Sequence, residues 1–156
     1  LDFLKQYEEI ANKYQINRKQ IELEITESAS MDVDLANIMK EIRKKGFSIS
    51  LDDFGTGYSS LNMLQDMPID VLKIDKSFID KIGNEKIDII KYIINMAKDL
   101  NIKTVAEGVE TENQIQYLKN IGCNIVQGYY YSKPLNKLEF KKYVKENQDG
   151  VKKRGL

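Results

Sequence analysis

Acidic side chains recur near the places where predicted strands of this chain end. Glu24, Asp52 and Glu107 each lie near the carboxyl end of a different predicted strand, and Asp53 follows Asp52 directly. Parallel α/β folds place their active sites at this end of the sheet. Three carboxylates on neighbouring strands repel one another strongly unless a cation lies among them. Because oxygen ligands without Cys or His suit Mg²⁺, Mn²⁺ or Ca²⁺, the sequence predicts a carboxylate-lined metal site.

The adjacent pair Asp52 and Asp53 is the most informative local feature. Neighbouring residues of a strand point to opposite faces, so both carboxylates reach one site only if the strand ends there and the chain turns. The segment 54–57 contains two glycines and is predicted to supply that turn. One Asp that bridges two cations while its neighbour holds the second suits two-metal hydrolysis of a phosphodiester. The alternative is an Asx-type turn after a strand.

Lys73 and Gln127 lie on two further predicted strands, and each has two interpretations. Lys73 either forms a structural ion pair with the carboxylates or orients a water molecule beside a metal ion. Gln127 either hydrogen-bonds to water, a base or a phosphate, or is an ordinary buried strand amide. The tyrosines at 129–131 either stack on a base or pack under the last helix.

The composition removes several classes of chemistry. The chain of 156 residues has no histidine, which excludes Ser-His-Asp and Cys-His catalysis and His-ligated zinc. The single cysteine excludes an internal disulfide framework. Lys plus Arg and Asp plus Glu both number 24, so we expect no generic binding to duplex nucleic acid. We also expect no membrane insertion and a cytoplasmic location, because no apolar run approaches about 18 residues.

Five strand patterns alternate with helix patterns along the chain, which is typical of a parallel sheet with helical crossovers. The fold class is therefore α/β, with about five βα units of a (β/α)₈ TIM-like barrel, which takes about 250 residues when complete. An open doubly wound sheet is the alternative. We expect one domain over 1–147 and a charged tail over 148–156. The predicted strands are 21–26, 47–53, 71–75, 103–109 and 124–130, and the predicted helices are 3–14, about 33–45, a short one near Leu61 and Leu64, about 85–100, 111–121 and 136–146.

Five sequence blocks together resemble the EAL-domain family of cyclic-di-GMP phosphodiesterases, in the order found in that family. The resemblance extends over nearly the whole chain, and five such blocks together are specific. They are LEITES at 23–28, DDFGTGYSSL at 52–61, LKIDKSFI at 72–79, VAEGVE at 105–110 and QGYYYSKP at 127–134.

The resemblance implies a barrel with two Mg²⁺ or Mn²⁺ ions that hydrolyses cyclic di-GMP to linear pGpG. Most of the residues that such a site uses match positions in these blocks. By the resemblance, the expected metal ligands are Glu24, Asp52, Asp53 and Glu107, the expected catalytic residues are Lys73, Glu107 and Glu110, the expected substrate-binding residues are Gln127 and Asp75, and Glu27 is expected to anchor the loop that begins at Asp52.

The family's name-giving Glu-Ala-Leu segment is expected upstream of Leu1, together with a metal-binding Asn. On this interpretation the chain is the C-terminal portion of the domain and is inactive alone. A non-catalytic module that senses cyclic di-GMP or binds a protein is the alternative. We expect homo-oligomers to form through the DDFGTG loop region or through exposed barrel edges.

Overall fold

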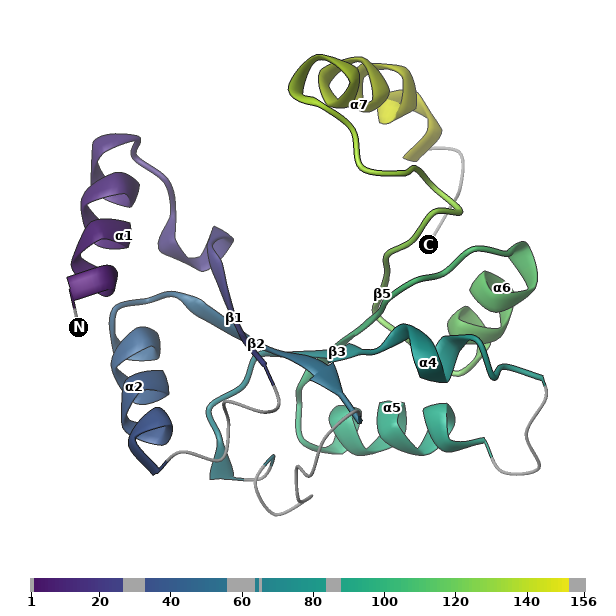
Figure 1. Ribbon diagram of the computed structural model, residues 1–156, viewed down its shortest axis with the longest axis horizontal. Helices are drawn as coiled ribbons and strands as arrows, with labels where there is room; N and C mark the ends of the chain where they lie inside the picture. The colour runs from purple at the N-terminus through teal and green to yellow at the C-terminus, as the bar shows by residue number, and fades with distance from the viewer. Residues whose placement is uncertain (1, 27–32, 56–63, 65, 84–87, 152–156) are drawn as a thin grey trace.

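A five-stranded parallel sheet is the centre of the molecule. The structure is a computed structural model that describes residues 2–26, 33–55, 64, 66–83 and 88–151 (Figure 1). The strands follow chain order across the sheet. They are β1 (Glu22–Thr26), β2 (Ser48–Phe54), β3 (Val71–Ile74), β4 (Lys103–Ala106) and β5 (Ile125–Val126).

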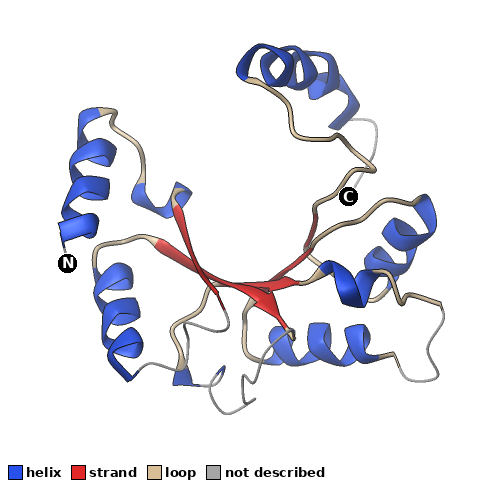
Figure 2. Ribbon diagram, in the orientation of Figure 1, coloured by secondary structure: helices blue, strands red, loops and turns tan. Residues whose placement is uncertain are grey.

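Helices follow most of the strands and cover one side of the sheet. In Figure 2, α2 and α5 lie on the convex side of the curved sheet, while α1 and α7 flank its open side at the two ends. None of the helices that the structure describes combines the length and the apolar character that a membrane crossing requires. The helices are α1 (Asp2–Lys13), the 3₁₀ turn η1 (Arg18–Gln20), α2 (Val33–Lys44), α4 (Lys76–Ile79), α5 (Ile89–Asp99), α6 (Glu112–Asn120) and α7 (Lys137–Val151).

The strand order separates the two architectures that the sequence allows. A doubly wound sheet reverses its strand order at a switch point and carries helices on both faces. Here the order is β1 to β5 without reversal, as in a barrel built from successive βα units. The described strands do not close, so β1 and β5 are edges of an incomplete barrel wall.

Alternation along the strands sends apolar side chains toward the helices. Ile49 and Leu51 of β2 and Leu72 and Ile74 of β3 are at most 1% exposed. Burial of each such side chain contributes about 1.5–3 kcal/mol relative to exposure. The helices contribute Met39, Ile42, Ile94, Ala97 and Leu118 to the same core. The residues between these strand positions, among them Ser50 and Lys73, point to the opposite face.

Helix boundaries agree with the sequence where a cap or a glycine marks them. The predicted capping box is present, because Thr111 and Gln114 bond to each other's backbone at the start of α6. Gly46 and Gly122 have φ values of 88° and 84° after α2 and α6, as a helix-ending glycine requires. The last helix continues to Val151, beyond the predicted end at 146. The predicted helix near Leu61 falls largely outside the described residues.

Four short features differ from the sequence prediction, and one is the end of β4 at Ala106, although 103–109 is predicted as a strand. The turns η1 and α4 were not predicted, because three or four residues are too few to show a helical period. β5 is limited to Ile125–Val126, although 124–130 is predicted as a strand. Gly128 explains the early end, because a Cβ there would overlap the backbone of Val109. The chain therefore crosses Val109 at close range instead of continuing as a regular strand.

Candidate metal centre

Asp52 and Asp53 lie in a bulge of β2. The pairing of β2 with β3 shifts register between Leu51 and Phe54, and Asp53 has a left-handed backbone with a φ of 57°. A bulge breaks the alternation of side chains, so two successive carboxylates reach the same region. The strand continues to Phe54, so the prediction that it ends at this pair is wrong. The bulge, rather than a strand end, brings both residues to one site.

The ammonium group of Lys73 lies at the centre of three carboxylates. Its Nζ is 2.9 Å from an oxygen of each of Glu24, Asp52 and Glu107. An ammonium group has three N–H donors; Lys73 donates a hydrogen bond to Glu24 and forms ion pairs with Asp52 and Glu107. The carboxylates come from β1, β2 and the residue after β4, and β3 supplies the lysine from the middle of the sheet. The predicted ion pairing of Lys73 is therefore present.

Burial and ion pairing shift the pKa of Lys73 in opposite directions. The side chain of this lysine is only 9% exposed. Burial is the largest single effect and lowers the pKa of the ammonium group. Hydrogen bonds to Glu107, Asp52 and Glu24 together outweigh it and raise the pKa above its usual value. The ion pairs with these carboxylates therefore favour the charged form of Lys73 on the inner face of the sheet.

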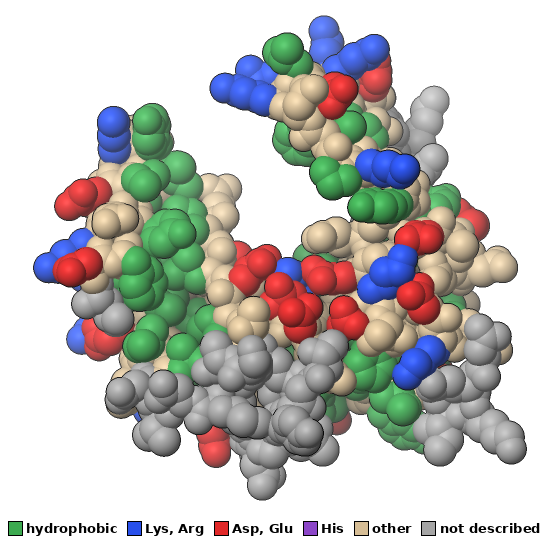
Figure 3. Space-filling view, viewed as in Figure 1, with side chains coloured by type: hydrophobic (Ala, Val, Ile, Leu, Met, Phe, Trp, Pro, Cys, Tyr) green, Lys and Arg blue, Asp and Glu red, His purple; other side chains and the backbone are tan. Residues whose placement is uncertain are grey.

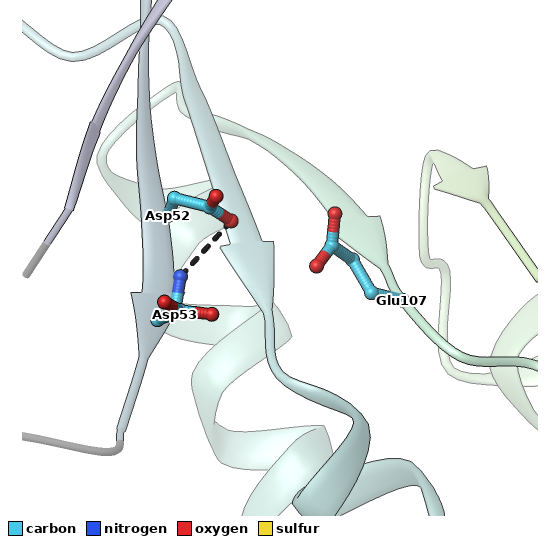
Figure 4. A group of neighbouring side chains, drawn as sticks. All are labelled: Asp52, Asp53 and Glu107. Atoms are coloured by element: carbon cyan, nitrogen blue, oxygen red, sulfur yellow. Dashed lines mark hydrogen bonds between the residues drawn. The ribbon is translucent and has the colours of Figure 1, made fainter.

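The carboxylates exceed the one cation among them. One oxygen from each of Asp52, Asp53 and Glu107 lies within 4.8 Å of the others (Figure 4). At that separation two unit charges repel by about 3 kcal/mol at an effective dielectric constant of about 20. We call Glu24, Asp52, Asp53, Lys73 and Glu107 the acidic cluster. Acidic side chains gather over the middle of the open face in Figure 3, and this donor set fits a hard divalent cation.

Glu24 and Glu110 lie at the margins of this arrangement. Glu24 bonds to Lys73, but its side chain is 53% exposed and it is outside the group of three close carboxylates. Glu110, predicted to support catalysis, forms an ion pair with Lys76. Its carboxylate thus faces the turn after β3 and is not part of the group formed by Asp52, Asp53 and Glu107.

Asp75, Gln127 and Glu27 complete the set of residues predicted from the sequence. Asp75 caps α4 by accepting the Ser77 N–H over 2.9 Å, and hydrogen bonds from Ser77 lower the pKa of its carboxyl group. The backbone of Gln127 forms two hydrogen bonds with the segment at the end of β4. Its N–H donates to the carbonyl of Ala106, and its carbonyl accepts from the N–H of Val109. Its side chain is exposed at the carboxyl end of β5. Glu27 lies outside the described residues.

Sequence reasoning missed Lys76 as the partner of Glu110. The two residues are 34 positions apart, and no local period connects them. Lys76 does lie within the LKIDKSFI block and directly after a strand end, which is the only signal that could have singled it out.

The chain matches a known domain family and several named proteins. The EAL domain model matches residues 1–134. Over 140 residues the chain is 46% identical to the probable cyclic di-GMP phosphodiesterase PdeB of Escherichia coli, which covers 89% of this chain and 27% of that protein. The chain thus spans 27% of the length of PdeB and 15% of the length of the cyclic di-GMP phosphodiesterase NbdA of Pseudomonas aeruginosa.

Solved structures show the same fold. The phosphodiesterase MucR of Pseudomonas aeruginosa, in complex with c-di-GMP, superposes with a TM-score of 0.81 at 37% identity, over 88% of this chain and 57% of that one. Klebsiella pneumoniae BlrP1, in a complex with manganese and cyclic di-GMP, gives a TM-score of 0.79 at 28% identity, over 85% and 35% of the two chains. The family match, the parallel βα units of a TIM-like barrel and the acidic cluster lead to one conclusion: this chain belongs to the EAL-domain family.

Proposed function

We propose that this chain is the C-terminal portion of a catalytic domain that hydrolyses cyclic di-GMP to linear pGpG. The single observation that carries the proposal is the group of three carboxylates, Asp52, Asp53 and Glu107, within 4.8 Å of one another in a chain that matches the EAL domain. The names of the matched relatives support cyclic di-GMP as the substrate.

Two divalent ions, Mg²⁺ or Mn²⁺, are the proposed cofactor and would activate water and neutralise the charge of the phosphodiester. Asp52, Asp53 and Glu107 would hold them, with Glu24 joining from β1. We propose Asp52 as the ligand that both ions share. It lies between Asp53 on its own strand and Lys73 on the next strand. The manganese complex of a structural neighbour supports the choice of ion.

Lys73 and Glu107 act directly on the reacting groups in this proposal. Lys73 is buried and positively charged, so it orients the attacking water and offsets negative charge on the phosphate. Glu107 follows β4 and lies 2.9 Å from Lys73, where it can accept a proton from that water. Glu110 supports the same loop, and Gln127 and Asp75 are proposed to contact the substrate. Glu27 is proposed to anchor the loop after β2.

The proposal also covers the bounds of the domain, the location of the protein and the association of its copies. Residues 1–147 form the domain portion and 148–156 the charged tail, in a cytoplasmic protein that neither inserts directly into membranes nor binds duplex nucleic acid. Copies of the chain associate through the loop that begins at Asp52 or through the open sheet edges. Exposed apolar side chains on α1, such as Tyr7 at 41% and Ile10 at 48%, support association at the β1 edge.

A second candidate function is binding of cyclic di-GMP without hydrolysis. One observation favours it: Lys73 already pairs with Glu24, Asp52 and Glu107, so the acidic cluster is partly neutralised before any metal binds. A site of this kind can hold a cyclic dinucleotide through Lys73 and yet bind metal too weakly for catalysis.

A chimera tests the proposed function. Residues 1–134 of this chain replace the matched segment of the MucR phosphodiesterase, and pGpG is measured by chromatography in Mg²⁺ or Mn²⁺. We expect turnover, and we expect Asp52→Asn to reduce it by at least about 100-fold. Asp99→Asn, an exposed change of the same charge on α5, is the matched control and leaves turnover unchanged.

The outcomes separate the two candidates. A folded chimera that binds cyclic di-GMP without producing pGpG would support the binding module, and one that neither binds nor hydrolyses it would reject both. The chain alone is expected to show no turnover, because its described sheet does not close. Turnover by the chain alone that depends on Asp52 would contradict that expectation.

A further inference from the structure

The one-turn helix α4 lies between the two segments that carry the close carboxylates. It follows β3, and the strand order places β3 between β2 and β4. Asp52 and Asp53 belong to the bulge of β2, whereas Glu107 follows β4. Pairing of β3 with β2 and β4 sets the spacing of the strands, and α4 lies next to the chain segments that continue beyond the paired residues.

Phe78 of α4 fills the space beside Gly55. Gly55 has a φ of 97°, and a Cβ on it would overlap the Phe78 ring. The ring therefore packs directly on the backbone two residues after Asp53. Phe78 also packs against the hydrophobic core, so its position is fixed from the other side as well. A side chain with a fixed position against a glycine limits how far the bulge can move.

Lys76 of α4 fills the corresponding space beside Gly108. Gly108 has a φ of 70°, and a Cβ on it would lie 2.5 Å from Cγ of Lys76 and 2.7 Å from its Cβ and Cδ. The aliphatic stem therefore packs on the residue directly after Glu107. The ammonium group at its end forms the ion pair with Glu110. Lys76 thus contacts the loop after β4 at two points, on either side of Val109.

We propose that Lys76 and Phe78 are positioning residues that set the separation between the Asp52–Asp53 bulge and Glu107. Neither side chain belongs to the acidic cluster. Phe78 acts through its contact with Gly55, and Lys76 acts through its contact with Gly108. This inference rests on the proposed function, because the separation matters for the divalent cation that these carboxylates would hold. It extends the site to a helix whose contacts had no assigned role.

The test measures Mn²⁺ binding to the whole chain by electron paramagnetic resonance, without substrate. We expect Phe78→Ala to weaken Mn²⁺ binding by about tenfold, as loss of a supporting contact does at other metal sites, with Phe78→Leu retaining most of the affinity. Lys76→Ala weakens binding by about fivefold, whereas Lys76→Met keeps the stem against Gly108 and stays within about twofold of the unchanged chain.

Two controls separate positioning from loss of stability. Phe140→Ala removes the same ring from a 57% exposed position on α7, and Ile42→Val destabilises the core beneath α2 away from the site. Both are expected to bind Mn²⁺ like the unchanged chain. Equal Mn²⁺ affinity in Phe78→Ala and the unchanged chain would overturn the proposal, as would an equal loss in Ile42→Val.

A metal-free measurement decides the proposal even if the chain itself binds no Mn²⁺, an outcome that would count against the proposed metal site alone. Amide hydrogen exchange of Asp53 and Glu107 is followed by NMR in each variant. Faster exchange at Asp53 in Phe78→Ala with rescue in Phe78→Leu, and at Glu107 in Lys76→Ala with rescue in Lys76→Met, supports positioning by α4. Unchanged exchange at these amides rejects it.

Discussion

Two clusters of ion pairs lie at opposite ends of the strands, and their surplus charges have opposite signs. In the acidic cluster one buried ammonium group, that of Lys73, faces an excess of carboxylates. Near the amino end, Glu8 of α1 faces two cations, with Arg18 at 2.8 Å and Lys45 at 3.0 Å. We call Glu8, Arg18 and Lys45 the basic cluster.

The two clusters differ in how their surplus charge is solvated. In the basic cluster the side chains of Arg18 and Lys45 are 30% and 42% exposed, so water solvates the surplus charge. Arg18 also bonds to Asn12 and to the Lys45 carbonyl and lies over the Phe47 ring. These contacts join α1 to the end of α2. In the acidic cluster the surplus charge is negative, crowded and next to a buried cation, so it favours a further cation. What distinguishes the acidic cluster is therefore the crowding of its surplus charge and not the number of its contacts.

The largest expected effect is on metal affinity and tests the imbalance directly. Asp52→Asn removes a carboxylate charge from the acidic cluster and is expected to weaken Mn²⁺ binding by about 10–100-fold or more. Isothermal titration of the chain with Mn²⁺ measures the change, with Asp99→Asn as the control. Equal weakening by both variants would mean that overall charge, rather than the cluster, binds the ion.

Lys73→Met removes the only cation of the acidic cluster and leaves its carboxylates facing one another. We expect the free energy of unfolding to fall by about 2 kcal/mol, less than for a fully buried pair because the carboxylates are partly exposed. Urea unfolding with and without Mn²⁺ measures this loss. Millimolar Mn²⁺ should restore most of the stability, because it replaces the missing positive charge. A loss that Mn²⁺ does not reduce would show that Lys73 acts through packing alone.

Arg18→Met makes the corresponding change in the basic cluster. It leaves Glu8 with Lys45 and with water, so we expect a smaller effect, a fall in Tm of about 2–4 °C. Thermal unfolding followed by circular dichroism measures it. Mn²⁺ should not alter the difference from the unchanged chain, and a clear rescue by Mn²⁺ would remove the distinction between the two clusters.

The smallest effect is the pH dependence of the basic cluster. The hydrogen bond from Lys45 lowers the pKa of Glu8, and Arg18 acts in the same direction. A lowered pKa in the folded state stabilises the protein above the unfolded value of about 4.3, and this contribution disappears as the pH falls through the lowered pKa. The Tm difference between the chain and Glu8→Gln should therefore be constant from about pH 7 to pH 5 and shrink below that. A difference that grows on acidification would reverse the assigned sign.

Local features of the sequence predicted most of the fold. Alternation of Ile49 and Leu51 with Ser48 and Ser50 identified β2 and its buried face, and Thr111 with Gln114 identified the start of α6. These signals are short-range, because a strand period or a helix cap involves residues at most a few positions apart. The short turn α4 and the early end of β5 gave no such signal.

In the candidate site, too, some features could be predicted from the sequence and others could not. The sequence by itself determined that carboxylates and one lysine lie near the carboxyl ends of parallel strands, because strand periods fix the ends and a parallel sheet brings them to one edge. Only the tertiary structure decided that Lys73 bonds to three of them at once, that a left-handed Asp53 turns two neighbours to the same side, and that Lys76 holds Glu110. The physical reason is that these contacts join residues 21 to 49 positions apart or depend on a bulge. Both are set by strand register and side-chain packing, which no local period encodes.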